Sequence, residues 1–119
     1  MVQLIFMKYF LIILAFPVVL QKQCDKNNDS IPVCIQRKID SIKAEAKWNP
    51  PAEVNEYVYK GQRVFLFTAN CCDQFYMLYD GTCHYICAPS GGITGKGDGK
   101  CADFNENAKH VKLVWKDSR

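Results

Sequence analysis

The sequence predicts an α+β domain in which one N-terminal helix packs on a small antiparallel sheet of about four or five strands, stapled by disulfides. Three observations lead to this class. One stretch repeats isoleucine at the spacing of a helix, the stretches after it alternate with the period of strands, and the 119-residue chain holds seven cysteines. A helix laid across a sheet is the simplest arrangement that buries the apolar surface of both.

The chain opens with an apolar run that is typical of a secretory signal peptide. Residues 9–20 are apolar enough to form its core, and Lys8 supplies the positive charge in front of that core. The run is shorter than the roughly 20 residues of a membrane-spanning helix, and it contains Pro17. We therefore predict a signal peptide at residues 1–22, with Met7 as an alternative start. An uncleaved membrane anchor is the other interpretation of this run.

A polar linker and one folded domain are expected to follow. Cys24 lies where a bacterial lipoprotein would carry its lipid, but residues 21–23 are polar and lack the small apolar residues that such processing requires. We predict a linker at residues 23–33 and a single α+β domain at residues 34–117. A length of roughly 100 residues is enough for one small domain and not for two.

The charge pattern excludes one class of partner. The formal net charge is +3, and acidic and basic residues are interleaved along the chain. The sequence contains no basic patch of the kind that binds nucleic acid. We expect a monomer that meets a protein or another partner in the cell envelope, with membrane association through the N-terminal segment only.

The cysteines predict a disulfide framework, since export places the chain in an oxidising compartment. Seven is an odd number, and Cys24, close to the leader, is our candidate for the unpaired thiol. The candidates for pairing are Cys34, Cys71, Cys72, Cys83, Cys87 and Cys101. Cys71 and Cys72 would point to opposite faces of an extended strand, so we expect them to bond to different layers, one of them to Cys34. The remaining three compete for the other bonds, and the connectivity stays open.

Two kinds of metal site are alternatives that the spacing disfavours. The cysteines around His84 could be drawn as zinc ligands, but two C-x2-C units are missing and the compartment is oxidising. Residues 25–36 begin like a calcium-binding EF-hand loop, yet Ser30 stands where that loop needs glycine and Gln36 where it needs glutamate. We therefore predict no metal site and no cofactor.

The expected helix begins after Ser30, which can serve as its N-cap, with Pro32 in the first turn. One apolar stripe follows at i, i+4, i+7 and i+11, formed by Ile35, Ile39, Ile42 and Ala46. Pro50 ends the helix because it disfavours helical geometry at Asn49. Burial contributes roughly 1.5–3 kcal/mol for each isoleucine, so the stripe is expected to face the core.

The chain then changes to the two-residue period of strands. Residues 54–59 and 63–69 flank Gly61, which suits the turn of a hairpin. Further strands are expected at residues 75–79, 84–87 and 111–115. The arrangement is similar to that of cystatin and PepSY domains, by analogy only.

A glycine-rich loop at residues 88–100 is the candidate binding surface. It does not fit the P-loop pattern, because Asp98 follows Gly97 where lysine is required. Glycine permits compact loop conformations, and the exposed backbone and few charges of such a loop also suit contact with a partner or an anion. The residues that we assign to binding are Gly95, Lys96, Gly97, Asp98 and Lys100.

Several motifs resemble those of an uncharacterised bacterial family. They are CCDQF at residues 71–75, LYD at residues 78–80 and GGITGKGDGKC at residues 91–101. The likeness extends from Cys34 to Asp117, with one departure at Ala102, where such proteins often carry proline. Members of that family are small exported proteins or lipoproteins with one domain of unknown function. The resemblance therefore implies an envelope or secreted location and a protein that is not an enzyme.

These observations predict a small exported binding or inhibitor-like module of unknown target, located in the periplasm, the envelope or the medium. It would contact its target through residues 88–100 and through neighbouring aromatic residues such as Phe75, Tyr76 and Tyr85. A membrane-anchored structural protein of the envelope is the alternative, and a zinc protein or an enzyme is less favoured. No catalytic residue is assigned, because neither a G-x-S-x-G elbow nor a cysteine-protease signature occurs.

Overall fold

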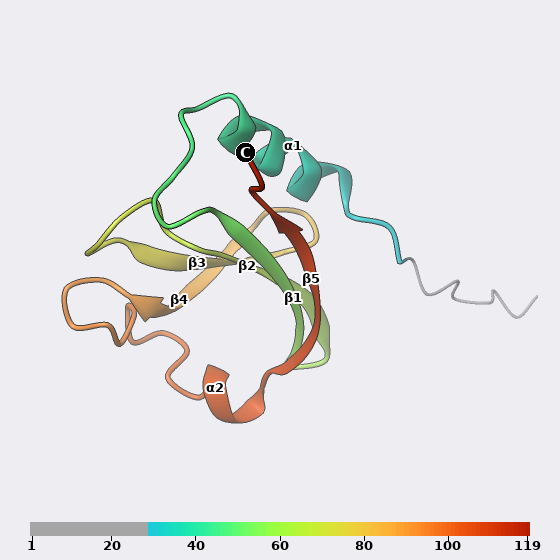
Figure 1. The fold of residues 1–119 in the computed structure, drawn as a ribbon. Coiled ribbons are helices and arrows are strands. Elements are labelled where there is room, and N and C mark those ends of the chain that lie inside the picture. The colour runs from blue at the N-terminus through green and yellow to red at the C-terminus, as the bar shows by residue number, and fades with distance from the viewer. Residues whose placement is uncertain (1–28) are drawn as a thin grey trace, which may run out of the picture.

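The computed structural model describes residues 29–119, and Figure 1 shows their arrangement. Within this range the elements are α1 (Val33–Lys43), β1 (Glu53–Tyr59), β2 (Gln62–Phe67), β3 (Phe75–Asp80), β4 (Tyr85–Gly91), α2 (Phe104–Asn107) and β5 (Lys109–Lys116). The strands form one antiparallel sheet in the order β4-β3-β2-β1-β5. The α+β class and the small antiparallel sheet are confirmed. The predicted signal peptide, most of the linker and Cys24 lie outside the described residues.

Helix α1 packs its isoleucine stripe on the sheet. Positions i, i+4 and i+7 share one side of a helix, so Ile35, Ile39 and Ile42 all face the same way. All three are buried, and their core cluster includes Val54 of β1 and two phenylalanines of β2. This stripe is the main attachment of α1 to the strands.

Both ends of α1 differ from the prediction. The N-cap is Pro32 rather than Ser30, and no side chain caps the first turn. The helix also ends before Ala46, which is exposed and takes no part in the stripe. The Glu45 N–H donates to the Ile42 carbonyl at 3.1 Å, and this three-residue spacing closes the last turn where an α-helix would have continued.

A tight hairpin joins β1 to β2, as predicted. Lys60 and Gly61 have φ angles of 50° and 78°, the left-handed values of a two-residue type I′ turn. On its other side β1 pairs with β5, so strands that are far apart in the sequence lie side by side.

Each face of the sheet is covered in part. Figure 1 shows α1 on one side and α2 on the other, and each belongs to its own core cluster. The second cluster consists of Tyr59, Val64, Leu78, Cys87, Cys101 and Phe104. Tyr59 Oη donates a hydrogen bond of 2.6 Å to Asp103, which holds the start of α2 near β1. The sequence does not predict this second layer, because a helix of four residues is too short to show a helical period.

Three disulfides join the six described cysteines. Cys34 is bonded to Cys83 and Cys87 to Cys101, with Cα atoms 6.0 Å and 6.1 Å apart. The third disulfide joins the sequence neighbours at positions 71 and 72, whose Cα atoms are 3.7 Å apart.

The expectation that Cys71 and Cys72 would bond to different layers, one of them to Cys34, was wrong. Both residues lie in the turn between β2 and β3, and Cys72 has a φ of 23°. The argument from opposite faces applies to an extended strand and not to this turn. Cys34 instead meets Cys83 in the connection between β3 and β4.

Candidate functional site

Strand β3 carries apolar side chains on both of its faces. Phe75, Met77 and Tyr79 occupy every second position, and Met77 pairs with Phe67 in the register, so these side chains point to the α1 face. Helix α1 packs mainly on β1 and β2. As a result, Phe75 and Met77 remain 42% and 38% exposed.

These side chains form the floor of a cleft of about 580 Å³, which we call the aromatic cleft. Helix α1 contributes Lys38, Ser41 and Ile42 to one wall, and the segment after the helix contributes Glu45 and Trp48. The rest of the lining comes from residues 67–70, 73–75, 77 and 79. The volume is within the range of about 300–1,000 Å³ that is typical of ligand sites.

The floor of the aromatic cleft is ordered by ring contacts. The rings of Phe67 and Tyr79 meet edge to face, with centroids 5.5 Å apart and an interplanar angle of 89°. Lys38 Nζ lies 4.1 Å from the centroid of the Tyr79 ring, a cation–π contact that places an ammonium group at the wall. The cleft therefore combines an apolar floor with charged groups above it.

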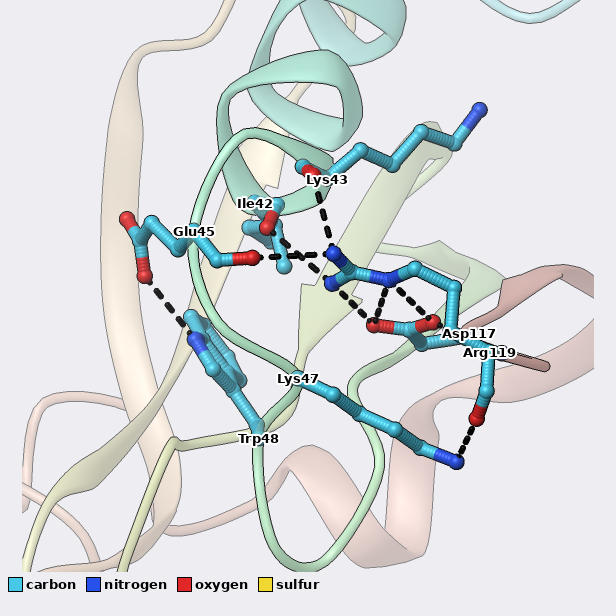
Figure 2. A network of polar contacts seen from close by, with 7 residues as sticks. All are labelled: Ile42, Lys43, Glu45, Lys47, Trp48, Asp117 and Arg119. Atoms are coloured by element: carbon cyan, nitrogen blue, oxygen red, sulfur yellow. Dashed lines mark hydrogen bonds and ion pairs between the residues drawn. The ribbon is translucent and has the colours of Figure 1, made fainter.

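The wall formed by Glu45 and Trp48 is anchored by a network of polar contacts, shown in Figure 2. Arg119 Nη1 donates to the carbonyls of Lys43 and Glu45, each at 2.9 Å. Arg119 Nη2 donates to the buried Asp117 carboxylate at 2.6 Å, and this bond lowers the pKa of Asp117 to about 2. Trp48 Nε1 donates to the Glu45 carboxylate at 2.9 Å. This wall is thus held in place without regular secondary structure.

The predicted loop at residues 88–100 begins too early, because β4 extends to Gly91; residues 92–100 form the loop, which we call the glycine loop and which touches the cleft through Phe75. A Cβ atom at Gly92 would lie 2.5 Å from Cε1 of the Phe75 ring, so glycine lets the loop pass close to that ring. The Gly92 N–H also donates to the Gln74 carbonyl at 3.0 Å. The predicted binding loop and the aromatic cleft therefore share a border.

Two of the residues that we assigned to binding anchor the loop to β4. Tyr85 Oη donates a hydrogen bond to Asp98, and the Asp98 N–H donates to the Ala88 carbonyl at 2.9 Å. A Cβ atom at Gly97 would lie 1.9 Å from that same carbonyl oxygen. Partial burial of the Tyr85 hydroxyl and then its bond to Asp98 raise the pKa of Tyr85 to about 12. The same bond lowers the pKa of Asp98.

The other three assigned residues lie on the exposed surface of the loop. Gly95 and Lys96 are exposed, and the Lys96 side chain makes no hydrogen bond or ion pair within residues 29–119. Lys100 Nζ lies 5.6 Å from the centroid of the Tyr85 ring. Their contact with a partner stays a prediction.

A family model for a domain of unknown function, DUF6970, matches residues 40–117. This chain belongs to that family. No curated protein and no solved structure matches the chain. The matched range spans all five strands and most of the aromatic cleft, so the cleft is part of the DUF6970 domain itself.

The DUF6970 domain separates the three aromatic residues that the sequence grouped beside the loop. Phe75 lines the aromatic cleft, Tyr76 points to the other side of β3, and Tyr85 holds Asp98. Sequence reasoning missed the cleft residues Lys38, Trp48, Phe67, Met77 and Tyr79. The signal available for them was the apolar composition of both faces of β3, since an apolar face that a single helix does not cover is a candidate binding surface.

The described part of the DUF6970 domain offers neither a metal-binding cluster nor a membrane-spanning helix. Residues 29–119 contain no group of three or more His, Cys, Asp or Glu side chains placed to hold a metal ion. His84 Nδ1 lies 2.7 Å from Thr82 Oγ1 and 3.5 Å from the Asp80 carboxylate. Neither helix of this range is long and apolar enough to cross a membrane. The predicted membrane association falls on residues 1–22, outside the described range.

Proposed function

We propose that this DUF6970 domain is a small extracytoplasmic binding module that takes up a segment of a protein partner in the aromatic cleft. The observation that carries the proposal is the cleft floor, where Phe75 and Met77 stay 42% and 38% exposed. Apolar side chains gathered in a concave site are typical of recognition surfaces. The neighbouring glycine loop also exposes an apolar side chain, Ile93, which is 89% exposed and lies outside the cleft lining.

The lining favours a partner segment that carries an apolar side chain next to a basic one. The aromatic rings and the adaptable thioether of Met77 suit an apolar side chain. The lining holds two carboxylates, Glu45 and Asp73, against one ammonium group, Lys38, so its net charge is negative. The Asp73 carboxylate makes no hydrogen bond or ion pair within the described residues, which leaves it available to a basic group.

Export is part of the proposal. Three disulfides in so small a domain are typical of extracytoplasmic proteins, and the apolar run at residues 9–20 supports a signal peptide. We place the protein in the bacterial periplasm, envelope or medium, as a monomer without enzymatic activity. Inhibition of the partner, by analogy with cystatin domains, is the narrower form of the same proposal.

The intact mass of protein from its native host tests the location. A mass that lacks residues 1–22, with cysteines 34, 71, 72, 83, 87 and 101 protected from alkylation before reduction, supports export. An unprocessed mass with these cysteines alkylated would overturn it.

Peptide selection tests the binding function. The full-length oxidised chain is immobilised and exposed to a displayed library of random peptides, and we expect enrichment of motifs that pair an apolar with a basic residue. Met77→Ser should weaken the selected peptides about tenfold or more, since a tenfold change corresponds to about 1.4 kcal/mol and burial of an apolar side chain contributes about that much.

Leu113→Ser is the matched control for this test. Leu113 is 50% exposed on β5 and does not line the aromatic cleft. Peptides that bind wild type and Leu113→Ser equally but lose affinity for Met77→Ser support the proposal. Equal binding to all three proteins would place recognition elsewhere.

A further inference from the structure

A second cavity, of about 400 Å³, adjoins the turn between β2 and β3. The Cys71–Cys72 disulfide and Tyr76 form part of it, and Ser90 with glycines of the glycine loop forms another part. We call it the disulfide cavity. It shares only Ala69 and Gln74 with the aromatic cleft, so its ligand would be separate from the partner segment proposed above.

The lining of the disulfide cavity is uncharged. It consists of proline, alanine, glutamine, tyrosine, serine, glycine and the two bonded cysteines, and it contains no Asp, Glu, Lys, Arg or His. An ion in this cavity would lose hydration without gaining an opposite charge. The lining therefore selects a neutral ligand.

Three side chains of the lining offer unused hydrogen-bonding groups. The amide of Gln74 and the hydroxyls of Tyr76 and Ser90 make no hydrogen bond within residues 29–119. A wholly apolar ligand would separate these groups from water without replacing their hydrogen bonds, which is unfavourable. The ligand must therefore carry several donors and acceptors.

The rest of the lining is preformed. The disulfide closes the side chains of Cys71 and Cys72 into a small ring with their backbone, so no side-chain rotamers have to be ordered when a ligand binds. The facing wall is packed tightly, because a Cβ atom at Gly91 would lie 2.4 Å from the Gln74 carbonyl oxygen. The Gly97 N–H also donates to the Gly91 carbonyl at 3.0 Å.

We infer that the disulfide cavity binds one neutral pyranose unit of a glycan. A pyranose has a face of C–H groups, which suits the Tyr76 ring and the disulfide, and a rim of hydroxyls, which suits the three unused polar side chains. A cavity of about 400 Å³ is large enough for a single sugar ring. This inference goes beyond the proposed function, which concerns a protein segment in the aromatic cleft.

Titration of the ¹⁵N-labelled full-length oxidised chain with monosaccharides tests the inference. The neutral probes are glucose, galactose and N-acetylglucosamine, and the charged controls are glucosamine and glucuronic acid. We expect the neutral sugars to shift amide signals of residues 71–76 and 90–95, with a dissociation constant on the order of 1 mM for so small a contact. The charged sugars should bind at least about tenfold more weakly.

Two sets of variants assign the site. Tyr76→Phe keeps the ring and should weaken sugar binding several-fold, whereas Tyr76→Leu removes ring and hydroxyl and should abolish it.

Gly95→Asn places a side chain at the cavity, and Gly99→Asn is its matched control. These two glycines have φ angles of 74° and 79° with no atom within 4 Å of an added Cβ, and only Gly95 lines the cavity. Asparagine tolerates such angles.

The result that supports the inference is loss of sugar shifts in Gly95→Asn and their retention in Gly99→Asn. The absence of shifts with every neutral sugar at about 50 mM would overturn it, because that concentration far exceeds a millimolar dissociation constant. Equal binding of the charged sugars, or equal behaviour of the two asparagine variants, would also overturn it. Should Tyr76→Leu fail to fold, the asparagine pair decides. Met77→Ser should leave the sugar shifts unchanged, which separates this site from the aromatic cleft.

Discussion

The Asp117 carboxylate holds the Arg119 guanidinium at 2.6 Å, in a position from which the guanidinium donates to the carbonyls at the C-terminal end of α1. The Asp117 side chain is 1% exposed, and a positive charge beside these carbonyls is favourable. Through this pair the segment after β5 supports the wall of the aromatic cleft.

The pair predicts a loss of stability in acid. Its hydrogen bond lowers the pKa of Asp117 to about 2, whereas an unfolded aspartate has a pKa of about 3.9. Because the folded-state pKa is the lower one, the contribution to the free energy of unfolding is complete above about pH 4 and is lost as the pH falls through about 2. Urea midpoints measured from neutral pH to strong acid should fall less steeply in Asp117→Asn than in wild type. Parallel acid profiles would show that the pair does not contribute.

Removal of the guanidinium should loosen the cleft wall. Arg119→Gln deprives the Ile42, Lys43 and Glu45 carbonyls of their donor, so we expect faster amide hydrogen exchange at residues 44–48. Lys96→Gln is the control, because the Lys96 side chain has no hydrogen bond or ion pair within the described residues. Exchange rates that stay at wild-type values in Arg119→Gln would mean that the wall is held by packing alone.

The disulfides should differ in their effect on stability. The Cys87–Cys101 bond has a sequence separation of 14, so its replacement by two alanines should lower the free energy of unfolding by about 3 kcal/mol. The Cys71–Cys72 bond joins adjacent residues and closes a much shorter loop, so replacement by two serines should lower the free energy of unfolding by only about 1 kcal/mol. Urea unfolding of both double variants measures the difference. Similar losses would contradict the prediction.

Two glycines of the loop should respond differently to alanine. Gly97 and Gly99 have φ angles of 74° and 79°, so substitution by alanine should lower the free energy of unfolding by about 1 kcal/mol at both positions through backbone strain alone. Only Gly97 lies against the Ala88 carbonyl, 1.9 Å from an added Cβ, so Gly97→Ala should cost at least about 1 kcal/mol more than Gly99→Ala. Thermal or urea unfolding of the two variants checks this, and equal costs would argue against the close packing of loop on strand.

Tyr85 should ionise well above the ordinary range of tyrosine. Its partial burial and its bond to Asp98 raise its pKa to about 12. Because the folded-state pKa is raised, the stability linked to this group is complete below about pH 10 and is lost as the pH rises through about 12. In an ultraviolet titration, Asp98→Asn should lower this pKa only in part, since the burial remains. The hydrogen bond to Asp103 also raises the pKa of Tyr59, so Tyr85→Phe should remove one ionisation from the late phase and leave the rest. A late phase of unchanged amplitude in Tyr85→Phe would contradict the assignment.

The helix and the strands follow from local pattern. The spacing of Ile35, Ile39 and Ile42 predicts one side of a helix, and Gly61 predicts the hairpin turn. Both elements form between residues that are close together in the chain, so a local pattern is enough to predict them. The predicted C-terminal end of α1 is wrong. Arg119 donates to the carbonyl of Lys43, the last residue of α1, and these two residues are 76 positions apart, so no local pattern predicts the contact.

The cysteine content and the alternation of apolar residues were sufficient for a disulfide-stapled α+β domain. The pairs themselves, the second core layer, the aromatic cleft and the disulfide cavity were decided by the tertiary structure. Cys34 and Cys83 are 49 positions apart and meet only after α1 has packed on the sheet. Likewise, Phe75 and Met77 become a cleft floor only because α1 covers the neighbouring strands and contacts β3 at Tyr79 but leaves Phe75 and Met77 uncovered. The period of the apolar residues predicts which side of a helix or strand is apolar. The packing of elements that are distant in the sequence determines which of those apolar sides stay exposed to solvent.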